Sequence, residues 1–247
     1  MNPRSKSGFT LIELSIVLVI IGLLVGGVLA GKAMIQAAEM RHAYGDLVRY
    51  ESAMYTFKNK YACLPGDCAN ASTFFPPAPD CNTVAINYDQ TCNGNGNGSI
   101  DFYYPNNNAM EQYFYWQQLS LASLISGKFA FNNPPPYGFG HPRMSWGGTS
   151  VSIVKGYSGS LPQDNRHYYV IGGYARGATM LWTWDNIIPA ADALAFDQKF
   201  DDGVSNRGRI QGGNVAYAPF SDTPCRTGSN YAVASFGTCY LSYDLFF

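Results

Sequence analysis

The chain has 247 residues, a length that suits one domain or one domain with a long appendage. Only 13% of its residues are charged, against about 25% in typical soluble domains, and the formal net charge is −1. Since lysine and arginine form no cluster along the chain, the composition gives no electrostatic case for nucleic-acid binding.

The N-terminal segment contains an apolar run that is long enough to cross a membrane. Residues 9–31 carry a single charge, Glu13, and a helix of this length spans roughly 34 Å. Arg4 and Lys6 precede the run and hold that end in the cytoplasm, although basic residues also flank the outer end. A carboxylate within a membrane helix is costly, so Glu13 is expected to face a partner. The alternative is a carboxylate at shallow depth near the cytoplasmic interface.

The stretch KSGFTLIELSIVLVIIGLL resembles the N-terminus of type IV pilins and type II secretion pseudopilins. The resemblance implies that residues 1–8 are a leader, which prepilin peptidase removes by cleavage between Gly8 and Phe9. It also implies methylation of the new Phe9 amine and pairing of Glu13 with the N-terminal amine of a neighbouring subunit. The implied partners are prepilin peptidase, like or related pilin subunits and an inner-membrane assembly platform. Ala30 stands where many pilins have a helix-kinking proline, so their helix geometry in a filament does not transfer to this chain.

The helix is expected to continue beyond the membrane as an extracytoplasmic half over residues 32–62. Apolar side chains recur there at near-helical spacing, at Met40, Tyr44, Leu47, Met54, Phe57 and Tyr61. Glu51 interrupts this stripe. Pro65 and Gly66 predict that the helix ends near Lys60. The stripe is expected to pack on a globular head.

Residues 63–247 are expected to form this head, and its six cysteines indicate how it is held together. An even count beyond a membrane segment indicates three disulfides in an oxidising compartment. Sequence proximity favours the pairs Cys63–Cys68, Cys81–Cys92 and Cys225–Cys239 among the 15 possible pairings. A zinc site is the alternative, although the chain has no C-x-x-C pair.

The head is predicted to contain two helices and an antiparallel sheet. Residues 108–126 predict a helix that Asn108 caps, with Glu111 in the capping-box position and Gly127 at its end. Residues 189–199 predict a short second helix. Four β-branched and aromatic stretches predict strands, namely SVSIVKG, HYYVIGG, ATMLWTW and CYLSYDLFF. A sheet that buries these strands against the long helix gives an α+β fold of the pilin type.

The loop NGNGNGSIDFYY carries candidate calcium ligands. Asn93, Asn95 and Asn97 take the first, third and fifth places of a calcium-binding loop. These side chains are neutral, however, and the twelfth place is Tyr104 instead of a glutamate. A series of Asn-Gly turns is therefore the favoured interpretation. The stretch CLPGDC, which resembles a segment of many pilins, is interpreted as a structural turn.

A second group of polar residues occurs late in the chain, at Asp197, Asp201, Asp202 and Asn206. Some secretion pseudopilins bind calcium through acidic residues in a late loop, which makes Asp201 and Asp202 candidate ligands. A turn at Asp202-Gly203 with solvated carboxylates is the favoured interpretation. No cofactor is otherwise expected.

The sequence favours a structural function. The motifs of metalloproteases, P-loop enzymes and serine hydrolases do not occur, and no nucleophile–base set is recognisable, so an enzyme is not expected. The resemblance implies a subunit of a type IV pilus or a type II secretion pseudopilus. The size of the head favours a minor or specialised subunit.

Two alternatives remain beside this interpretation: a tip-located pilin that binds a ligand, and a membrane-anchored periplasmic domain that does not polymerise. The expected location is a single pass through the inner membrane, with the N-terminus cytoplasmic and the head periplasmic. Incorporation into a pilus or pseudopilus would follow.

Overall fold

A computed structural model of the chain describes Gly8 and residues 10–79, 81, 85–86, 89–101, 111–132, 140–156, 166–173, 187–213, 224–235 and 237–246. Phe9, the predicted cap Asn108, Tyr104 and the predicted strand ATMLWTW lie outside these residues. The structure divides into two compact units, Met1–Arg41 and His42–Phe247.

Helix α1, Leu11–Tyr61, begins in the first unit and ends in the second. Its N-terminal part is long and apolar enough to cross a membrane, and the apolar side chains there are exposed. The helix ends where the backbone turns left-handed at Ala62, whose φ is 59° and whose N–H donates to the carbonyl of Lys58. This end agrees with the prediction that the helix stops near Lys60.

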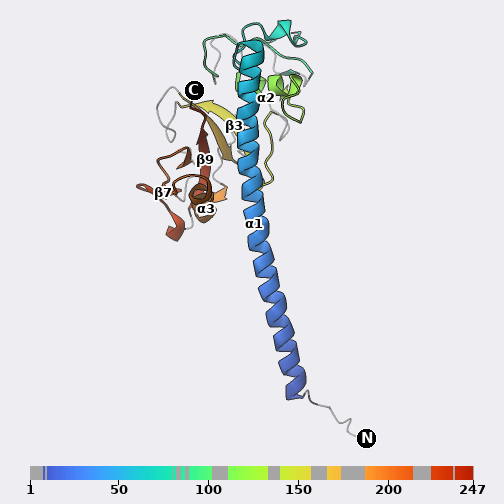
Figure 1. Cartoon of the computed structure of the whole chain (residues 1–247), viewed down its shortest axis with the longest axis vertical. Coiled ribbons are helices and arrows are strands. Elements are labelled where there is room, and N and C mark those ends of the chain that lie inside the picture. The colour runs from blue at the N-terminus through green and yellow to red at the C-terminus, as the bar shows by residue number, and fades with distance from the viewer. Residues whose placement is uncertain are drawn as a thin grey trace. The chain divides into compact units, whose positions relative to one another are not determined.

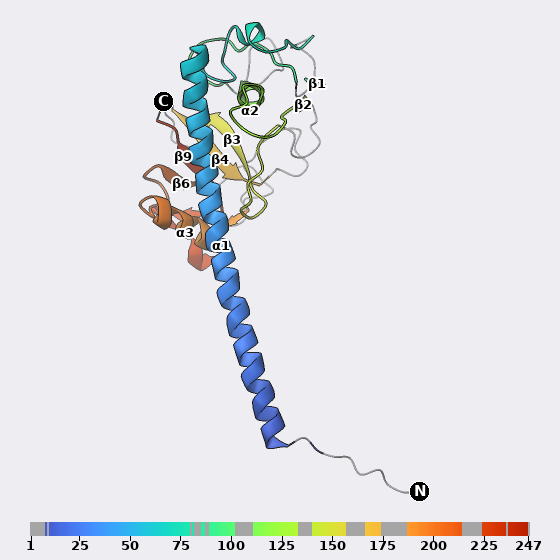
Figure 2. The same cartoon turned by 45° about the vertical axis from the view of Figure 1, so that its right-hand side comes forward.

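Residues 42–61 of α1 pack on the rest of the head through one face. Leu47, Met54 and Phe57 of the predicted stripe are fully buried. Tyr44 stacks on Phe200, with ring centroids 4.3 Å apart. Figures 1 and 2 both show α2 and strand β3 beside this part of the helix. The predicted packing of the stripe is therefore confirmed.

The head contains a five-stranded antiparallel sheet with β9 at its centre (Figure 1). Its strands are β3 Ser150–Lys155, β4 His167–Gly172, β5 Ile188–Pro189, β6 Ile210–Gly213 and β9 Thr238–Asp244. Strand β9 pairs with β4 through Tyr169↔Tyr243, and with β6 through Gln211↔Ser242. Three of the predicted strands correspond to β3, β4 and β9.

Short elements surround the sheet. They are 3-10 helices Ala71–Thr73 and Val233–Ser235, helices α2 Glu111–Leu121 and α3 Ala190–Phe200, and the pairs β1 Ala85–Ile86 with β2 Phe131–Asn132 and β7 Arg226–Thr227 with β8 Asn230–Tyr231. Helix α3 confirms the predicted second helix, and Pro189 lies at its N-cap.

Helix α2 ends earlier than predicted, at Leu121 instead of Ser126. Ser123 adopts a left-handed conformation with a φ of 59°, and the N–H of Leu124 donates to the carbonyl of Leu119. This closing bond is typical of a helix C-terminus. The expectation that Gly127 ends the helix was wrong. The left-handed residue after the helix is Ser123, and a serine gives no sequence signal for that conformation.

The core of the head lies where α1, α2 and the sheet meet. Trp116 of α2 is fully buried, and its ring centroid lies 5.1 Å from Tyr50 of α1 and 5.6 Å from Tyr169 of β4. Tyr115 also faces the sheet, where its hydroxyl shares a hydrogen bond with that of Tyr169. Aromatic packing thus joins the helix to the sheet across this core.

Candidate processing site and polar sites of the head

The predicted cleavage site lies just before α1. Gly8 is exposed, and a Cβ atom added to it would meet nothing within 4 Å, so the bond after it is sterically open on that side. Phe9 lies outside the described residues. Glu13 lies in the first turn of α1, and its side chain is exposed.

Glu13 has a partner inside its own chain. The backbone N–H and the hydroxyl of Thr10 both donate to Glu13 Oε2, each at 2.8 Å. The N–H of Glu13 donates to Thr10 Oγ1 at 3.3 Å. These reciprocal bonds form a capping box at the start of the helix. The residues TLIE carry the sequence pattern of such a box, so the sequence could have indicated it, although the predictions for Glu13 considered only a partner subunit or a shallow position in the membrane.

The geometry of this segment is that of an apolar helix with a capped, acidic first turn, preceded by a short basic peptide. Residues 3–29 match the family described as the prokaryotic N-terminal methylation motif. The comparisons found no curated protein and no solved structure with a significant match to the chain.

The fold and the N-terminal segment define the class of this protein. It is an α+β protein of pilin-like architecture with an apolar helix for membrane anchoring. The matched motif supports a prepilin leader like those of type IV pilins and pseudopilins, and with it a subunit of the pilin or pseudopilin type. The same motif implies processing by a prepilin peptidase and assembly with pilin-like subunits.

The cysteines of the head form three disulfides, Cys63–Cys68, Cys81–Cys92 and Cys225–Cys239. These are the pairs that sequence proximity favoured. The first disulfide closes the turn after α1, and the third joins β9 to the segment before β7. All six sulfur atoms are used, so zinc binding by the cysteines is excluded.

The Asn-Gly loop is organised around Asp67, which the structure buries. The N–H of Asn97 donates to Asp67 Oδ1 at 3.0 Å, and the N–H of Gly98 donates to Oδ2 at 2.8 Å. The amide oxygen of Asn95 accepts from the N–H of Asn97, and that of Asn97 accepts from the N–H of Ser99. Backbone amides therefore occupy the oxygens considered as calcium ligands, which agrees with the turn interpretation.

Glu111 binds this loop through both carboxylate oxygens, while its predicted capping partner Asn108 lies outside the described residues. Its Oε1 accepts from the N–H of Asn95 at 2.8 Å, and its Oε2 accepts from the N–H of Asp101 at 2.7 Å. Burial, with a smaller contribution from the nearby carboxylates of Asp67 and Asp101, raises the pKa of Glu111 to about 7 despite these two hydrogen bonds, which lower it. Burial also raises the pKa of Asp67.

The late acidic residues come together in the structure. Among the residues that the structure describes, Asp197, Asp201 and Asp202 each place an oxygen within 4.8 Å of the others. Asp197 is fully buried, so the expectation of solvated carboxylates was wrong for this residue. It accepts from the hydroxyl of Tyr231 at 2.8 Å and from the N–H of Gly203 at 3.1 Å. Burial raises the pKa of Asp197 to about 6.

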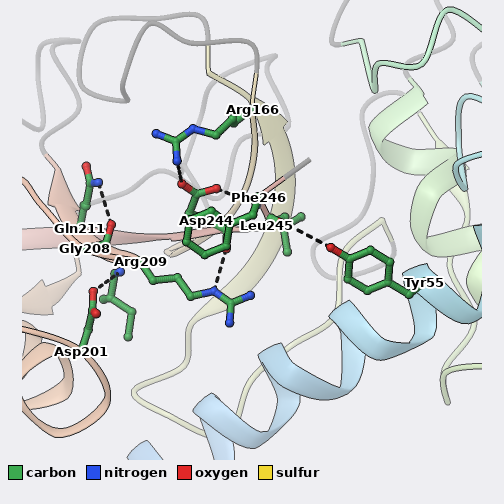
Figure 3. A network of polar contacts seen from close by, with 10 residues as sticks. Tyr55, Arg166, Asp201, Gly208, Arg209, Gln211, Asp244, Leu245 and Phe246 are labelled. Carbon is green, nitrogen blue, oxygen red and sulfur yellow. Dashed lines mark hydrogen bonds and ion pairs between the residues drawn. The ribbon is translucent and has the colours of Figure 1, made fainter.

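The other two carboxylates of this group also accept backbone hydrogen bonds. Asp201 Oδ2 accepts from the N–H of Ile210 at 2.8 Å, and Asp202 Oδ1 accepts from the N–H of Val204 at 2.8 Å. The Asp201 contact ties the loop to the start of β6 (Figure 3). The arrangement closes the loop between α3 and β6 through its own backbone.

A polar network joins α1 to the C-terminal strand, and sequence reasoning missed it. Glu51 forms an ion pair with Arg209 and accepts from the hydroxyl of Tyr243 at 3.0 Å. Arg209 also donates from Nε to the carbonyl of Asp244, whose carboxylate pairs with Arg166 (Figure 3). Glu51 interrupts the apolar stripe because it meets a cation from the loop just before β6, far along the chain, which no local pattern reveals.

Proposed function

We propose that this protein is a structural prepilin that is cleaved between Gly8 and Phe9, methylated at Phe9 and assembled into a type IV pilus or a type II secretion pseudopilus. The observation that carries the proposal is Glu13, the one charge in an apolar helix that lies within the N-terminal methylation motif. The large head, residues 63–247, supports a minor or specialised subunit.

The proposed topology places the N-terminus in the cytoplasm and the head in the periplasm before assembly. Arg4 and Lys6 support this orientation, because basic residues are retained on the cytoplasmic side. The three disulfides support it independently, since disulfides persist in oxidising compartments.

The proposed function of Glu13 is to pair with the N-terminal amine of a neighbouring subunit. Both Thr10 bonds end on the same carboxylate oxygen, Oε2, and a carboxylate can accept at both of its oxygens. An ion pair in a low-dielectric membrane is far stronger than in water. Thr10 can therefore orient Glu13 at the start of the helix while the charge binds the neighbouring subunit.

The test separates the charge of Glu13 from its capping contact. Glu13→Gln keeps an acceptor for Thr10 and removes the charge, whereas Thr10→Val removes the hydroxyl and keeps the charge. We expect Glu13→Gln to abolish incorporation into filaments, because the amine of the neighbour loses its counter-charge, and Thr10→Val to assemble. Immunoblots of sheared filaments measure incorporation. Mass spectrometry should show a mature chain that begins at methylated Phe9 in both variants.

Three results would contradict the proposal. Normal filament incorporation of Glu13→Gln would exclude the charge pairing. Equal defects in Glu13→Gln and Thr10→Val would assign Glu13 to helix capping alone. A processed membrane fraction in which the chain still begins at Met1 would contradict the cleavage itself.

A further inference from the structure

Four dipeptides in this chain are chemically labile by composition: Asn93-Gly94, Asn95-Gly96, Asn97-Gly98 and Asp202-Gly203. In an Asn-Gly pair the glycine nitrogen can lose its proton and attack the side-chain carbonyl carbon of the asparagine. A succinimide ring forms as the new C–N bond replaces the bond to the carboxamide nitrogen, which leaves as ammonia. Water then opens the ring to aspartate or isoaspartate. Glycine favours the attack because it has no side chain to hinder it.

In each of the three Asn-Gly pairs, the backbone N–H of the glycine donates a hydrogen bond. The N–H of Gly94 donates to the carbonyl of Cys68 at 2.9 Å, and the N–H of Gly96 donates to the carbonyl of Asp67 at 2.9 Å. The N–H of Gly98 donates to Asp67 Oδ2 at 2.8 Å. Each hydrogen bond must break before its nitrogen can act as the nucleophile. All three acceptors belong to the turn that the Cys63–Cys68 disulfide closes.

The asparagine side chains are held as well. The side-chain nitrogens of Asn95 and Asn97 donate to Asp101 Oδ2 at 3.0 and 2.7 Å. The side-chain oxygen of Asn93 accepts from the N–H of Ser72 at 2.8 Å. These contacts restrain the carboxamides, so the approach of each to the following nitrogen requires further bonds to break.

The glycines themselves cannot be exchanged for a less labile neighbour. A Cβ atom added to Gly94 would lie 2.3 Å from the carbonyl oxygen of Gly66 and 2.4 Å from the backbone of Asp67. Gly96 and Gly98 have φ values of +71° and +82°, which other residues rarely adopt. The close packing of the loop on the turn thus requires the labile sequence.

We propose that Asp67 and the Cys63–Cys68 turn protect the three Asn-Gly sites from succinimide formation, and that these asparagines become modification sites when the turn is disturbed. In the fourth dipeptide, Asp202-Gly203, the glycine nitrogen is held in the same way, because its N–H donates to Asp197 Oδ1 at 3.1 Å. Modification of Asn97 would replace a donor to Asp101 by a carboxylate, and the repulsion between two carboxylates would loosen the loop.

The test measures the rate of modification at each site in the full-length chain in detergent. Folded protein and urea-unfolded protein are incubated at the same mildly alkaline pH, and peptide mapping by mass spectrometry follows aspartate and isoaspartate at Asn93, Asn95 and Asn97. We expect all three sites to react more slowly in the folded protein, by about tenfold or more, because at least one hydrogen bond must open first.

Asp67→Ala distinguishes the sites from one another. This variant removes the acceptor of the Gly98 N–H and leaves the backbone acceptor of Gly94 in place. We expect modification at Asn97 to accelerate about tenfold, with Asn93 as the internal reference. Asp46→Ala is the matched control, since the ion pair of Asp46 is with Arg49 of its own helix.

Three results would overturn the proposal. The first is a rate at Asn97 that is equal in folded and unfolded wild-type protein. The second is an unchanged rate at Asn97 in a folded Asp67→Ala variant. The third is a slower rate in that variant, which would make Asp67 a base that promotes the attack. Should Asp67→Ala fail to fold, the comparison of folded and unfolded wild-type protein decides the question alone.

Discussion

Buried carboxylates determine how the loops of the head are held. Asp67, Glu111 and Asp197 are each less than 5% exposed. Asp67 and Glu111 accept hydrogen bonds from backbone N–H groups remote in sequence, and Asp197 accepts one from the turn that follows α3. A buried charge is costly unless hydrogen bonds compensate it. These three residues therefore give the loops a defined conformation, and the burial that makes them effective also raises the pKa of each.

Glu111 predicts a pH dependence of stability. Its pKa is about 7 in the folded protein and 4.5 as an ordinary glutamate, so the folded state binds the proton more tightly. The free energy of unfolding should therefore fall as the pH rises from about 4.5 through about 7. Glu111→Gln cannot titrate, and we expect its stability to fall less steeply over this interval. Urea unfolding of the full-length chain at a series of pH values measures the difference.

The comparison requires a variant that loses a carboxylate elsewhere. Asp46→Asn in α1 serves this purpose, because it removes a carboxylate whose ion pair is with Arg49 of the same helix, and its curve gives the effect of losing a carboxylate as such. Since Asp197 contributes a change of the same sign in every variant, only the difference between curves reports on Glu111. Equal slopes for Glu111→Gln and the wild type would refute the prediction.

At the scale of elements, residues 42–61 of α1 are joined to the sheet by two kinds of contact. Aromatic packing connects Tyr50 to Tyr169 of β4, with centroids 6.4 Å apart. The ion pair between Glu51 and Arg209 is the second kind of contact. Arg209 also lies 4.2 Å from the ring centroid of Tyr243 and so links α1 to β9. Such a pair is worth more than an exposed one, since both partners are partly shielded from water.

Glu51→Ala should destabilise the head by about 1–3 kcal/mol, because Arg209 and the Tyr243 hydroxyl both lose a partly buried acceptor. Asp46→Ala on the same helix breaks a pair with Arg49, whose side chain is 54% exposed, and should cost about 0.5 kcal/mol or less. Urea unfolding of both variants gives the two values. Equal costs would show that the Glu51 contact adds nothing beyond an ordinary surface ion pair.

At the scale of the whole molecule, the two units have different tasks. The first unit contains the methylation motif and the apolar part of α1. The second unit contains the sheet, helices α2 and α3 and all three disulfides. Processing and membrane anchoring belong to one unit, while the buried core belongs to the other.

This division predicts that a chain beginning at His42 folds without the first unit. The apolar stripe of α1 is retained from Tyr44 to Tyr61, with Met40 lost, and the three disulfides lie wholly within this part. We expect cooperative thermal unfolding, followed by circular dichroism, and the pairs Cys63–Cys68, Cys81–Cys92 and Cys225–Cys239 in a disulfide map. Scrambled pairs or the absence of a cooperative transition would show that the head depends on residues 1–41.

The sequence by itself determined the features that local patterns encode. Helical periodicity and Pro65 located α1 and its end, and β-branched runs located three strands of the sheet. Proximity along the chain was enough for the disulfide pairs, since short loops close at the least entropic cost. The N-terminal motif is contiguous as well, which is why it could be recognised without a structure.

Only the tertiary structure decided which distant groups meet. The sequence indicated no partner for Glu51, which the structure pairs with Arg209, and it did not indicate that the carboxylate of Glu111 accepts from the N–H groups of a distant loop. Strand β6 escaped prediction because its glycines are poor strand formers. A Cβ at Gly213 would lie 2.3 Å from the ring of Tyr240, so only a glycine fits there. A local sequence pattern indicates the structure that a segment favours by itself. These contacts form only when packing brings remote segments together.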